Sequence, residues 1–552
     1  MESWARRLRR RISRNELSLK LLRLKSEEGN ATEPGLLIIQ IDALSRRQLE
    51  RAMAHQRMPF LRTLMRRDNY GLFTHYSGQP SSTPVVQGEL FYGVKSAVPA
   101  FSFYDRKRRE VVRMYVPQAG ERVEEGLKKL GEPLLKGGSA YSNVYQGGAA
   151  ESHFCVPDLG WGAAKKPPSK LRFLAILALN ASGFLRVLGL IVVEFFLAWV
   201  DFFRGIRRGE SFWQELKFVP TRVGVSIMLR EFIVAGASVD LARGLPVVHL
   251  NFLGYDEQAH RRGPTSAFAH WTLLGIDGAI RRLYSAAARS HTRDYSVWIY
   301  SDHGQEESVG FEQEVGATLR EVMDEVFLGR ETFSWQRQAE VQRFNAEQNH
   351  WAGLRKRKIS KIVEPDFPKV SQEDRIVITA MGPVGHVYDL DDDGWDKRLR
   401  AEEMVKRGIP LVLYKNAEGE VEAVNAEGHF VLPRDAKALF GQRHPAWEDV
   451  GTDLARVANH PQAGDFVISG WRRARRMVSF ADENGSHGGP GREEVSGFLL
   501  LPPGTAIESS SRTDYFRPRD LRRAVFHYLN RRPLPDYFST LAGRRPADNL
   551  RV

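Results

Sequence analysis

The chain has 552 residues, 42% of them hydrophobic, so it can bury a substantial core and can form two or more domains, or one large domain with insertions. Its single cysteine, Cys155, excludes an internal disulfide framework and favours a reducing compartment, the cytoplasm. With 80 Lys and Arg against 67 Asp and Glu, the formal charge is +13, which suits an anionic partner such as a phosphate ester, an acidic lipid surface or nucleic acid without choosing among them.

The first predicted element is a basic amphipathic helix within residues 1–30. Many arginines are interspersed with Trp4, Leu8 and Ile12. The segment lacks the uninterrupted apolar core and the small-residue cleavage site of a secretory signal. Two interpretations are equally favoured, adhesion to an anionic membrane and a solvated surface helix.

A strand and a helix start follow. Residues 35–45 (GLLIIQIDALS) form a short apolar run that stops at Asp42, as expected of a buried parallel strand. Residues 78–93 (GQPSSTPVVQGELFYG) place three hydroxyls directly before Pro84, which is typical of the first position of a helix. An alkoxide at such a terminus is stabilised by free backbone N–H groups and by the helix dipole, so the same residues can cap the helix and supply a nucleophile.

Residues 171–208 are the most apolar part of the chain. Charged residues interrupt the segment, so its uncharged runs are shorter than the ~20 residues needed to cross a bilayer, and a single span is not expected. Two interpretations stay open: one or two helices in the membrane interface, with Trp199 and nearby arginines near the head groups, or a buried helical hairpin. The large apolar residues beside a basic flank favour membrane contact. The interrupting residues are Arg172, Arg186, Glu194 and Asp201.

Two later segments, 245–260 and 294–307, repeat the pattern of an apolar run that ends in Asp and His. Helical patterns separate these strands, so the sequence predicts an α/β fold: a mostly parallel central sheet with helices on both faces. In such sheets, ligands bind beyond the carboxyl ends of the strands. Asp and His side chains there would suit zinc or manganese. A lone Asp is more often a helix cap, and a lone His is more often a surface group. The converging residues are Asp42, Asp256, His260, Asp302 and His303, with His487 from the glycine-rich loop 480–494.

In the order and spacing of these motifs, the chain resembles the alkaline phosphatase superfamily, most closely its type I phosphodiesterase and nucleotide pyrophosphatase branch. The resemblance extends from residue 35 to about residue 500. It implies a metal-dependent phosphoric ester hydrolase. The motifs that carry it are the strand-end Asp42, the hydroxyls of residues 78–93, the Asp-x-x-x-His pair Asp256 and His260, the SDHG segment with Asp302 and His303, and the GSHGG segment with His487.

The resemblance implies two divalent metal ions. The histidine content favours zinc, with manganese as the alternative. In such a site one ion activates the attacking oxygen and the other neutralises the leaving oxygen. The residues implied are Asp42, Thr83, Asp302 and His303 for one ion, and Asp256, His260 and His487 for the other.

The resemblance makes Thr83 the expected nucleophile, because it stands at the family's distance from Gly93. Many relatives place the proline two positions after the nucleophile, and by that criterion Ser82 would qualify. A sulfatase would have an arginine where this chain has Val86, which disfavours that class. Nucleotide pyrophosphatases have an asparagine near the same position that binds a phosphoryl oxygen, so Gln87 or a backbone amide would have to take that role here. The expected reaction is attack of Thr83 on phosphorus and hydrolysis of the covalent intermediate by water.

The motifs also divide the chain. A catalytic core is predicted from residues 31–100, 241–310 and 480–545, and two inserted cap subdomains from residues 101–240, which include the apolar segment, and 311–479. No nucleic-acid-binding module is recognised, and the oligomeric state is not readable.

The sequence is consistent with three alternative functions. The first is a phosphodiesterase or phosphatase at the inner membrane surface in the cytoplasm, acting on a nucleotide or lipid-linked phosphate. The second is a transferase of phospho-alcohol head groups. The third is an inactive, membrane-associated binding protein, which the complete set of ligand residues disfavours.

Overall fold

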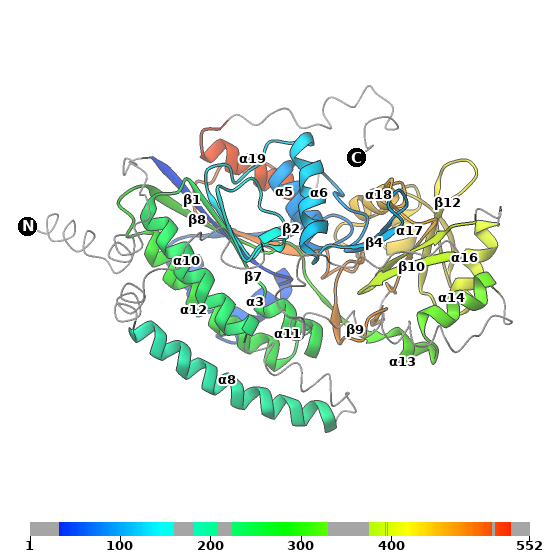
Figure 1. Ribbon diagram of the computed structural model, residues 1–552, viewed down its shortest axis with the longest axis horizontal. Coiled ribbons are helices and arrows are strands. Elements are labelled where there is room, and N and C mark those ends of the chain that lie inside the picture. Colours follow the sequence, from blue (N-terminus) through cyan, green and yellow to red (C-terminus); the bar gives the residue numbers. More distant parts are fainter. Residues whose placement is uncertain are drawn as a thin grey trace, which may run out of the picture.

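The computed structural model describes residues 33–158, 181–207, 224–328, 375–391, 394, 396–473, 475–510 and 514–531. Its largest sheet has eight strands in the order β19-β2-β18-β8-β1-β7-β5-β6 (Figure 1). These strands are β1 (Pro34–Ile41), β2 (Gly71–Tyr76), β5 (Ser139–Tyr141), β6 (Glu151–His153), β7 (Val247–Phe252), β8 (Asp294–Tyr300), β18 (Ser496–Leu501) and β19 (Tyr515–Phe516).

The sheet is mostly parallel. Strand β1 lies between β7 and β8 and runs parallel to both, with Leu36 opposite Val247 and Ser296. Strand β18 runs antiparallel to its neighbours β2 and β8. The α/β fold predicted from the sequence is therefore confirmed.

Helices cover both faces of this sheet, which explains why β1 reads as an unbroken apolar run. Alternate residues of β1 enter opposite cores: Leu37 and Ile39 pack into one, Leu36 and Ile38 into the other. The first core is closed by α3 (Arg46–Ala54), α4 (Pro59–Arg67), α10 (Arg230–Arg243), α11 (Gly254–Arg262) and α12 (Ala267–Ala287); the second is closed by α5 (Thr83–Tyr92), α6 (Pro117–Leu130) and α19 (Pro518–Tyr528).

A second, antiparallel sheet of six strands lies beside the central one (Figure 1). All of its residues fall within the segment 311–479. Its order is β10 (Ile376–Met381), β11 (Val384–Asp389), β15 (Phe466–Ser469), β12 (Leu411–Lys415), β13 (Val421–Asn425) and β14 (Gly428–Leu432). The helices that accompany it are α13 (Phe311–Val315), α14 (Leu319–Leu328), α16 (Lys397–Lys406), α17 (Ala436–Phe440) and α18 (Trp447–Ala458).

Smaller elements join the two sheets. The hairpin of β3 (Ser102–Asp105) and β4 (Glu110–Arg113) contacts β10, and a three-stranded sheet has the order β16 (Met477–Ser479), β9 (Glu306–Gly310), β17 (Gly485–Ser486). Strand β9 pairs with β17 directly before His487, so this small sheet brings the loop 480–494 to the end of β8.

The segment 101–240 contributes to more than one part of the molecule. Strands β5 and β6 extend the central sheet, and a short turn of helix η1 (Val156–Asp158) follows them. Within the apolar segment, Ala181–Arg207 forms helix α8, and a π-helical turn η2 (Gly224–Leu229) leads into α10. Among the helices that the structure describes, none has the length and apolarity needed to cross a membrane. The basic helix predicted for residues 1–30 lies outside the described residues.

Candidate active site

The predicted site residues meet at the carboxyl ends of three neighbouring strands. Asp42 follows β1 directly, and Asp302 and His303 follow β8, its parallel neighbour. Helix α11 begins just after β7 and carries Asp256 and His260 one turn apart, so both side chains lie on one helix face. The fold therefore places residues more than two hundred positions apart at one edge of the sheet.

Three residues form what we call the inner group: Asp42, Asp302 and His303. Their potential ligand atoms lie within 4.8 Å of one another, and all three side chains are buried. Thr83 at the start of α5 borders this group: its Oγ1 lies 3.3 Å from Asp42 Oδ1 and 3.3 Å from His303 Nε2. The hydroxyl of Ser82 is buried too, but it has no hydrogen-bond partner. Of the two hydroxyls, that of Thr83 is the one hydrogen-bonded to the inner group.

The outer group consists of Asp256, His260 and His487. Their ligand atoms also lie within 4.8 Å of one another, and the three residues are half-buried. Asp256 Oδ1 is 3.3 Å from His260 Nε2 and 3.7 Å from His487 Nε2. The rings of His487 and His303 stack with centroids 4.0 Å apart, so the two groups are adjacent.

The three histidines of the inner and outer groups each place Nδ1 within hydrogen-bond distance of an oxygen acceptor. His303 Nδ1 lies 3.0 Å from the Gly304 carbonyl, His487 Nδ1 lies 3.1 Å from the Ser81 carbonyl, and His260 Nδ1 lies 2.8 Å from Glu483 Oε2. This arrangement leaves each Nε2 directed into its group. It is the usual arrangement of metal-ligating histidines, in which the second ring nitrogen is held by a carbonyl or carboxylate.

The two groups differ in their protonation. Burial, followed by the charges of Asp302 and Asp256, raises the pKa of Asp42 well above its usual range, and burial raises the pKa of Asp302 to about 7. In the outer group, burial also opposes the charge of Asp256, but the nearby His260 outweighs it and lowers the pKa of that carboxyl. The two inner carboxylates would therefore gain from a nearby cation. In the outer group, burial lowers the pKa of His260, but Asp256 and Glu483 outweigh it and raise that pKa, so Asp256 already has one cationic partner.

Comparison with protein families decides the assignment. Residues 36–423 match the model of the family described as type I phosphodiesterase / nucleotide pyrophosphatase, well over half of the chain. The chain belongs to this family. It is accordingly a phosphoester hydrolase of the alkaline phosphatase superfamily, as the motifs predicted.

Solved structures similar to this phosphodiesterase-family chain are distant in sequence. Phosphonoacetate hydrolase from Sinorhizobium meliloti 1021, in complex with phosphonoformate, is 13% identical with a TM-score of 0.45, covering 92% of this chain and 96% of its own. An inactive variant of murine ectonucleotide pyrophosphatase / phosphodiesterase 5, in complex with AMP, is 12% identical with a TM-score of 0.47, covering 91% of this chain and 96% of its own. No curated protein shows significant similarity to the chain.

The donor atoms of this phosphodiesterase-family site fit divalent metal ions. The inner group offers two carboxylates, one imidazole and the Thr83 hydroxyl, and the outer group offers one carboxylate and two imidazoles. Such mixed nitrogen and oxygen sets suit zinc, and a buried pair of carboxylates gains from a cation. The inner group with Thr83, and the outer group, are thus the residues that would each hold one ion.

The position of the Gln87 side chain does not suit a phosphoryl-binding role. Its amide nitrogen lies 3.0 Å from Gln40 Oε1, and its amide oxygen accepts a hydrogen bond of 2.9 Å from the Val144 backbone. The side chain is fully buried in this network. These contacts count against Gln87 as the group that binds a phosphoryl oxygen.

Several supporting residues were missed by the sequence analysis. Asn251 donates a 2.5 Å hydrogen bond to Asp42 Oδ2, Glu483 accepts from His260, and Gln305 donates to Asp256 Oδ1. A polar residue inside an apolar strand was a signal for Asn251, which interrupts VVHLNF. Glu483 had no such signal, because its position depends on the pairing of β9 with β17. Gln305 stands two residues after His303, and no pattern in the sequence marked it.

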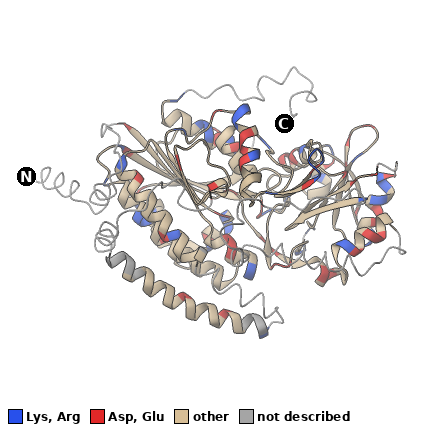
Figure 2. Ribbon diagram, viewed as in Figure 1, with Lys and Arg blue, Asp and Glu red and all other residues tan. Residues whose placement is uncertain are grey.

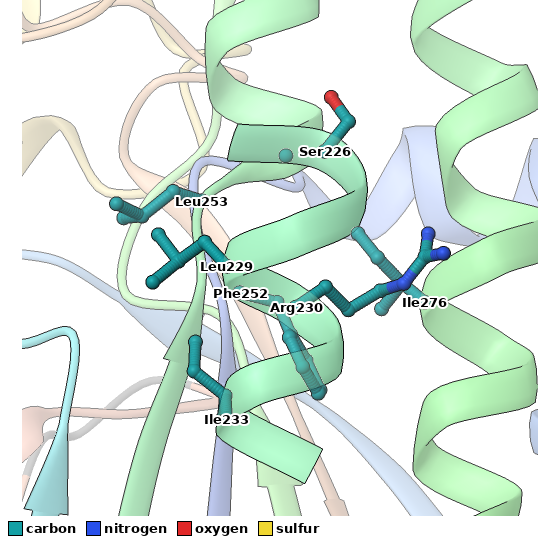
Figure 3. Close-up of a pocket in the computed structure, with 8 residues that line it drawn as sticks. Ser226, Leu229, Arg230, Ile233, Phe252, Leu253 and Ile276 are labelled. Atoms are coloured by element: carbon teal, nitrogen blue, oxygen red, sulfur yellow. The ribbon is translucent and has the colours of Figure 1, made fainter. Parts of the chain in front are cut away.

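A small cavity between η2, α10, α11 and α12 is separate from this site. Its lining includes Ser226, Arg230 and Ile276 and none of the residues of the inner and outer groups (Figure 3). Gly254, the first residue of α11, also lines it.

Proposed function

We propose that the protein is a phosphodiesterase in which Thr83 is the nucleophile and two divalent ions, zinc in preference to manganese, occupy the inner and outer groups. The observation that carries this proposal is the position of the Thr83 hydroxyl, 3.3 Å from both Asp42 Oδ1 and His303 Nε2 at the start of a helix. A hydroxyl so placed has the helix dipole and the inner group to stabilise its alkoxide.

The residues of the chain have separate tasks in this reaction. Thr83 Oγ1 loses its proton to solvent and attacks phosphorus, and the bond to the leaving oxygen breaks as that oxygen takes up a proton from water. A water molecule then attacks phosphorus, the bond to Thr83 breaks, and a proton returns to Oγ1. Asp42 Oδ1 accepts a hydrogen bond from the Thr83 hydroxyl and so orients Oγ1. Asn251 holds the second oxygen of Asp42, and Ser81 holds His487 through its carbonyl. Bound ions would supply Lewis-acid stabilisation of the attacking and leaving oxygens.

The experiment that tests the nucleophile compares Thr83→Ala with Ser82→Ala. Metal-stripped protein, with zinc or manganese added back, is assayed with bis(p-nitrophenyl) phosphate and with p-nitrophenyl phosphate. We expect preference for the diester and a loss of about a thousandfold or more in Thr83→Ala alone, because removal of a nucleophile abolishes the covalent route. Loss of activity in Ser82→Ala with retention in Thr83→Ala would reverse the assignment.

Other outcomes of the same assay select other functions. Preference for the monoester would make the protein a phosphatase. Absence of turnover with either metal would favour a head-group transferase that requires an acceptor, or a binding protein with an inactive site.

We propose further that the enzyme acts at the inner, cytoplasmic surface of a membrane, on a nucleotide or lipid-linked phosphate. The formal charge of +13 and the single cysteine support this location. The strongest support is the exposure of helix α8, from which the next inference develops.

A further inference from the structure

Helix α8 (Ala181–Arg207) has an inverted distribution of polar and apolar side chains. Both of its acidic residues, Glu194 and Asp201, face the protein and are only 6% and 2% exposed. Its outward face carries large apolar side chains, with Leu185 and Phe196 both 66% exposed and Phe203 62% exposed. The others on this outward face are Leu188, Val192, Val193, Phe195 and Val200. A surface helix in water normally has the opposite arrangement.

The inward face of α8 is fixed to the helix that carries two site residues. Arg262 Nε donates to both carboxylate oxygens of Asp201, at 2.9 and 3.0 Å, and both side chains are buried. Arg262 ends α11, two residues after His260. The turn η2 contacts both α8 and α11, and Met228 of η2 is exposed as well. The outward face of α8 is thus oriented relative to the outer group by a buried ion pair.

The chemistry of this face fits a bilayer interface. The exposed Leu, Val and Phe side chains of this face have no acidic side chain among them, because Glu194 and Asp201, the acidic residues of α8, are both buried. Figure 2 shows how few acidic positions the described part of α8 contains. Arg207 at the helix end is exposed and Arg208 follows it in the sequence, which suits anionic head groups. At 27 residues the helix is about 40 Å long, and it lies along the edge of the molecule beside the helical layer of α10, α11 and α12 (Figure 1).

We propose that the outward face of α8 lies in the interfacial layer of an anionic phospholipid bilayer, with the helix parallel to the membrane plane. This inference rests on the proposed membrane location and deepens it by naming the docking element and the lipid chemistry. Through the Arg262–Asp201 pair, docking holds α11 and its ligands Asp256 and His260 at a fixed orientation to the bilayer. The phosphoester that the site receives is then one presented at the lipid surface.

The test is sedimentation with lipid vesicles. The full-length protein is mixed with vesicles of equimolar phosphatidylglycerol and phosphatidylcholine, and with vesicles of phosphatidylcholine alone, at low and high salt. Two variants are compared: Phe196→Glu on the outward face of α8, and Leu399→Glu, a matched change of an exposed apolar residue on α16. Hydrolysis of soluble bis(p-nitrophenyl) phosphate is measured on the same preparations.

We expect the wild-type protein and Leu399→Glu to bind the anionic vesicles, more weakly at high salt, and Phe196→Glu to bind at least about tenfold more weakly. The rate with the soluble diester should be equal in all three proteins. Failure of the full-length protein to bind, or equal binding by Phe196→Glu, would overturn the inference. So would light scattering that shows a wild-type dimer and a monomeric Phe196→Glu, because a second copy would then cover the face. Binding without any hydrolysis would instead refute the proposed catalytic function and leave the docking helix standing.

Discussion

The inner and outer groups contrast in how the fold builds them. The inner group follows two adjacent strands of the central sheet, and its residues are 3% exposed or less. The outer group combines a helix, α11, with a loop that enters from the small sheet of β9, β16 and β17, and its residues are half-buried. The first arrangement is set by strand register, whereas the second depends on packing between separate elements.

The contrast extends to charge. Burial has the largest effect on the pKa of Asp42 in the inner group, and the charges of Asp302 and Asp256 raise that pKa further. In the outer group, a chain of contacts from Asp256 through His260 to Glu483 alternates negative and positive partners. The outer group is therefore ordered by its own hydrogen bonds, while the inner group is ordered by the backbone and gains the most from a bound cation.

The largest effect is expected from Asp302→Asn. This change removes a negative ligand beside Thr83, so it should abolish one bound ion and lower the diesterase rate about a thousandfold or more. Metal content by mass spectrometry and the rate with bis(p-nitrophenyl) phosphate measure the two effects. Asp294→Asn is the control, because it changes an exposed aspartate at the opposite end of the same strand. Full metal content and full rate in Asp302→Asn would show that the inner group holds no catalytic ion.

A smaller effect is expected from Glu483→Gln. The carboxylate of Glu483 holds His260 Nδ1 at 2.8 Å, so its neutralisation should weaken ion binding in the outer group about 10- to 100-fold. A titration with zinc should then restore the rate at higher metal concentration. The adjacent Asp482 is exposed, and Asp482→Asn should leave the titration unchanged. A lowered rate that zinc does not restore would indicate that Glu483 acts on the fold and not on His260.

The difference between the groups also explains what the sequence revealed. Each of the residues Asp42, Asp256, Asp302 and His303 stands at or just after the end of an apolar run, and the structure brings them together because parallel strands end at one edge. The α/β fold followed from the same alternation of strands and helices. These features depend on local pattern, and local pattern can be read from one sequence.

Features that depend on pairing between distant segments could not be predicted. Glu483 reaches the outer group from a loop that the pairing of β9 with β17 holds beside α11, and the hairpin β10–β11 joins a six-stranded sheet through its pairing with β15. In α8, Glu194 and Asp201 looked like interruptions of an apolar segment. The structure shows instead that both side chains are buried, with Asp201 hydrogen-bonded to Arg262.

The smallest predicted effect concerns the pH dependence of folding stability. It tests a buried histidine of the sheet and not a residue of the inner or outer group. His75 on β2 is fully buried, and burial lowers its pKa from 6.5 to about 4. The folded chain therefore keeps His75 neutral while the unfolded chain protonates it, so this stabilisation is complete above pH 6.5 and is lost as the pH falls toward about 4. This loss of stability amounts to at most about 3 kcal/mol at one residue.

His75→Phe should thus reduce the shift in urea midpoint between about pH 7 and about pH 5. The exposed His55 provides the control His55→Gln, which should keep the wild-type shift. An unchanged shift in His75→Phe would show that burial of this imidazole does not contribute to the acid sensitivity of the fold.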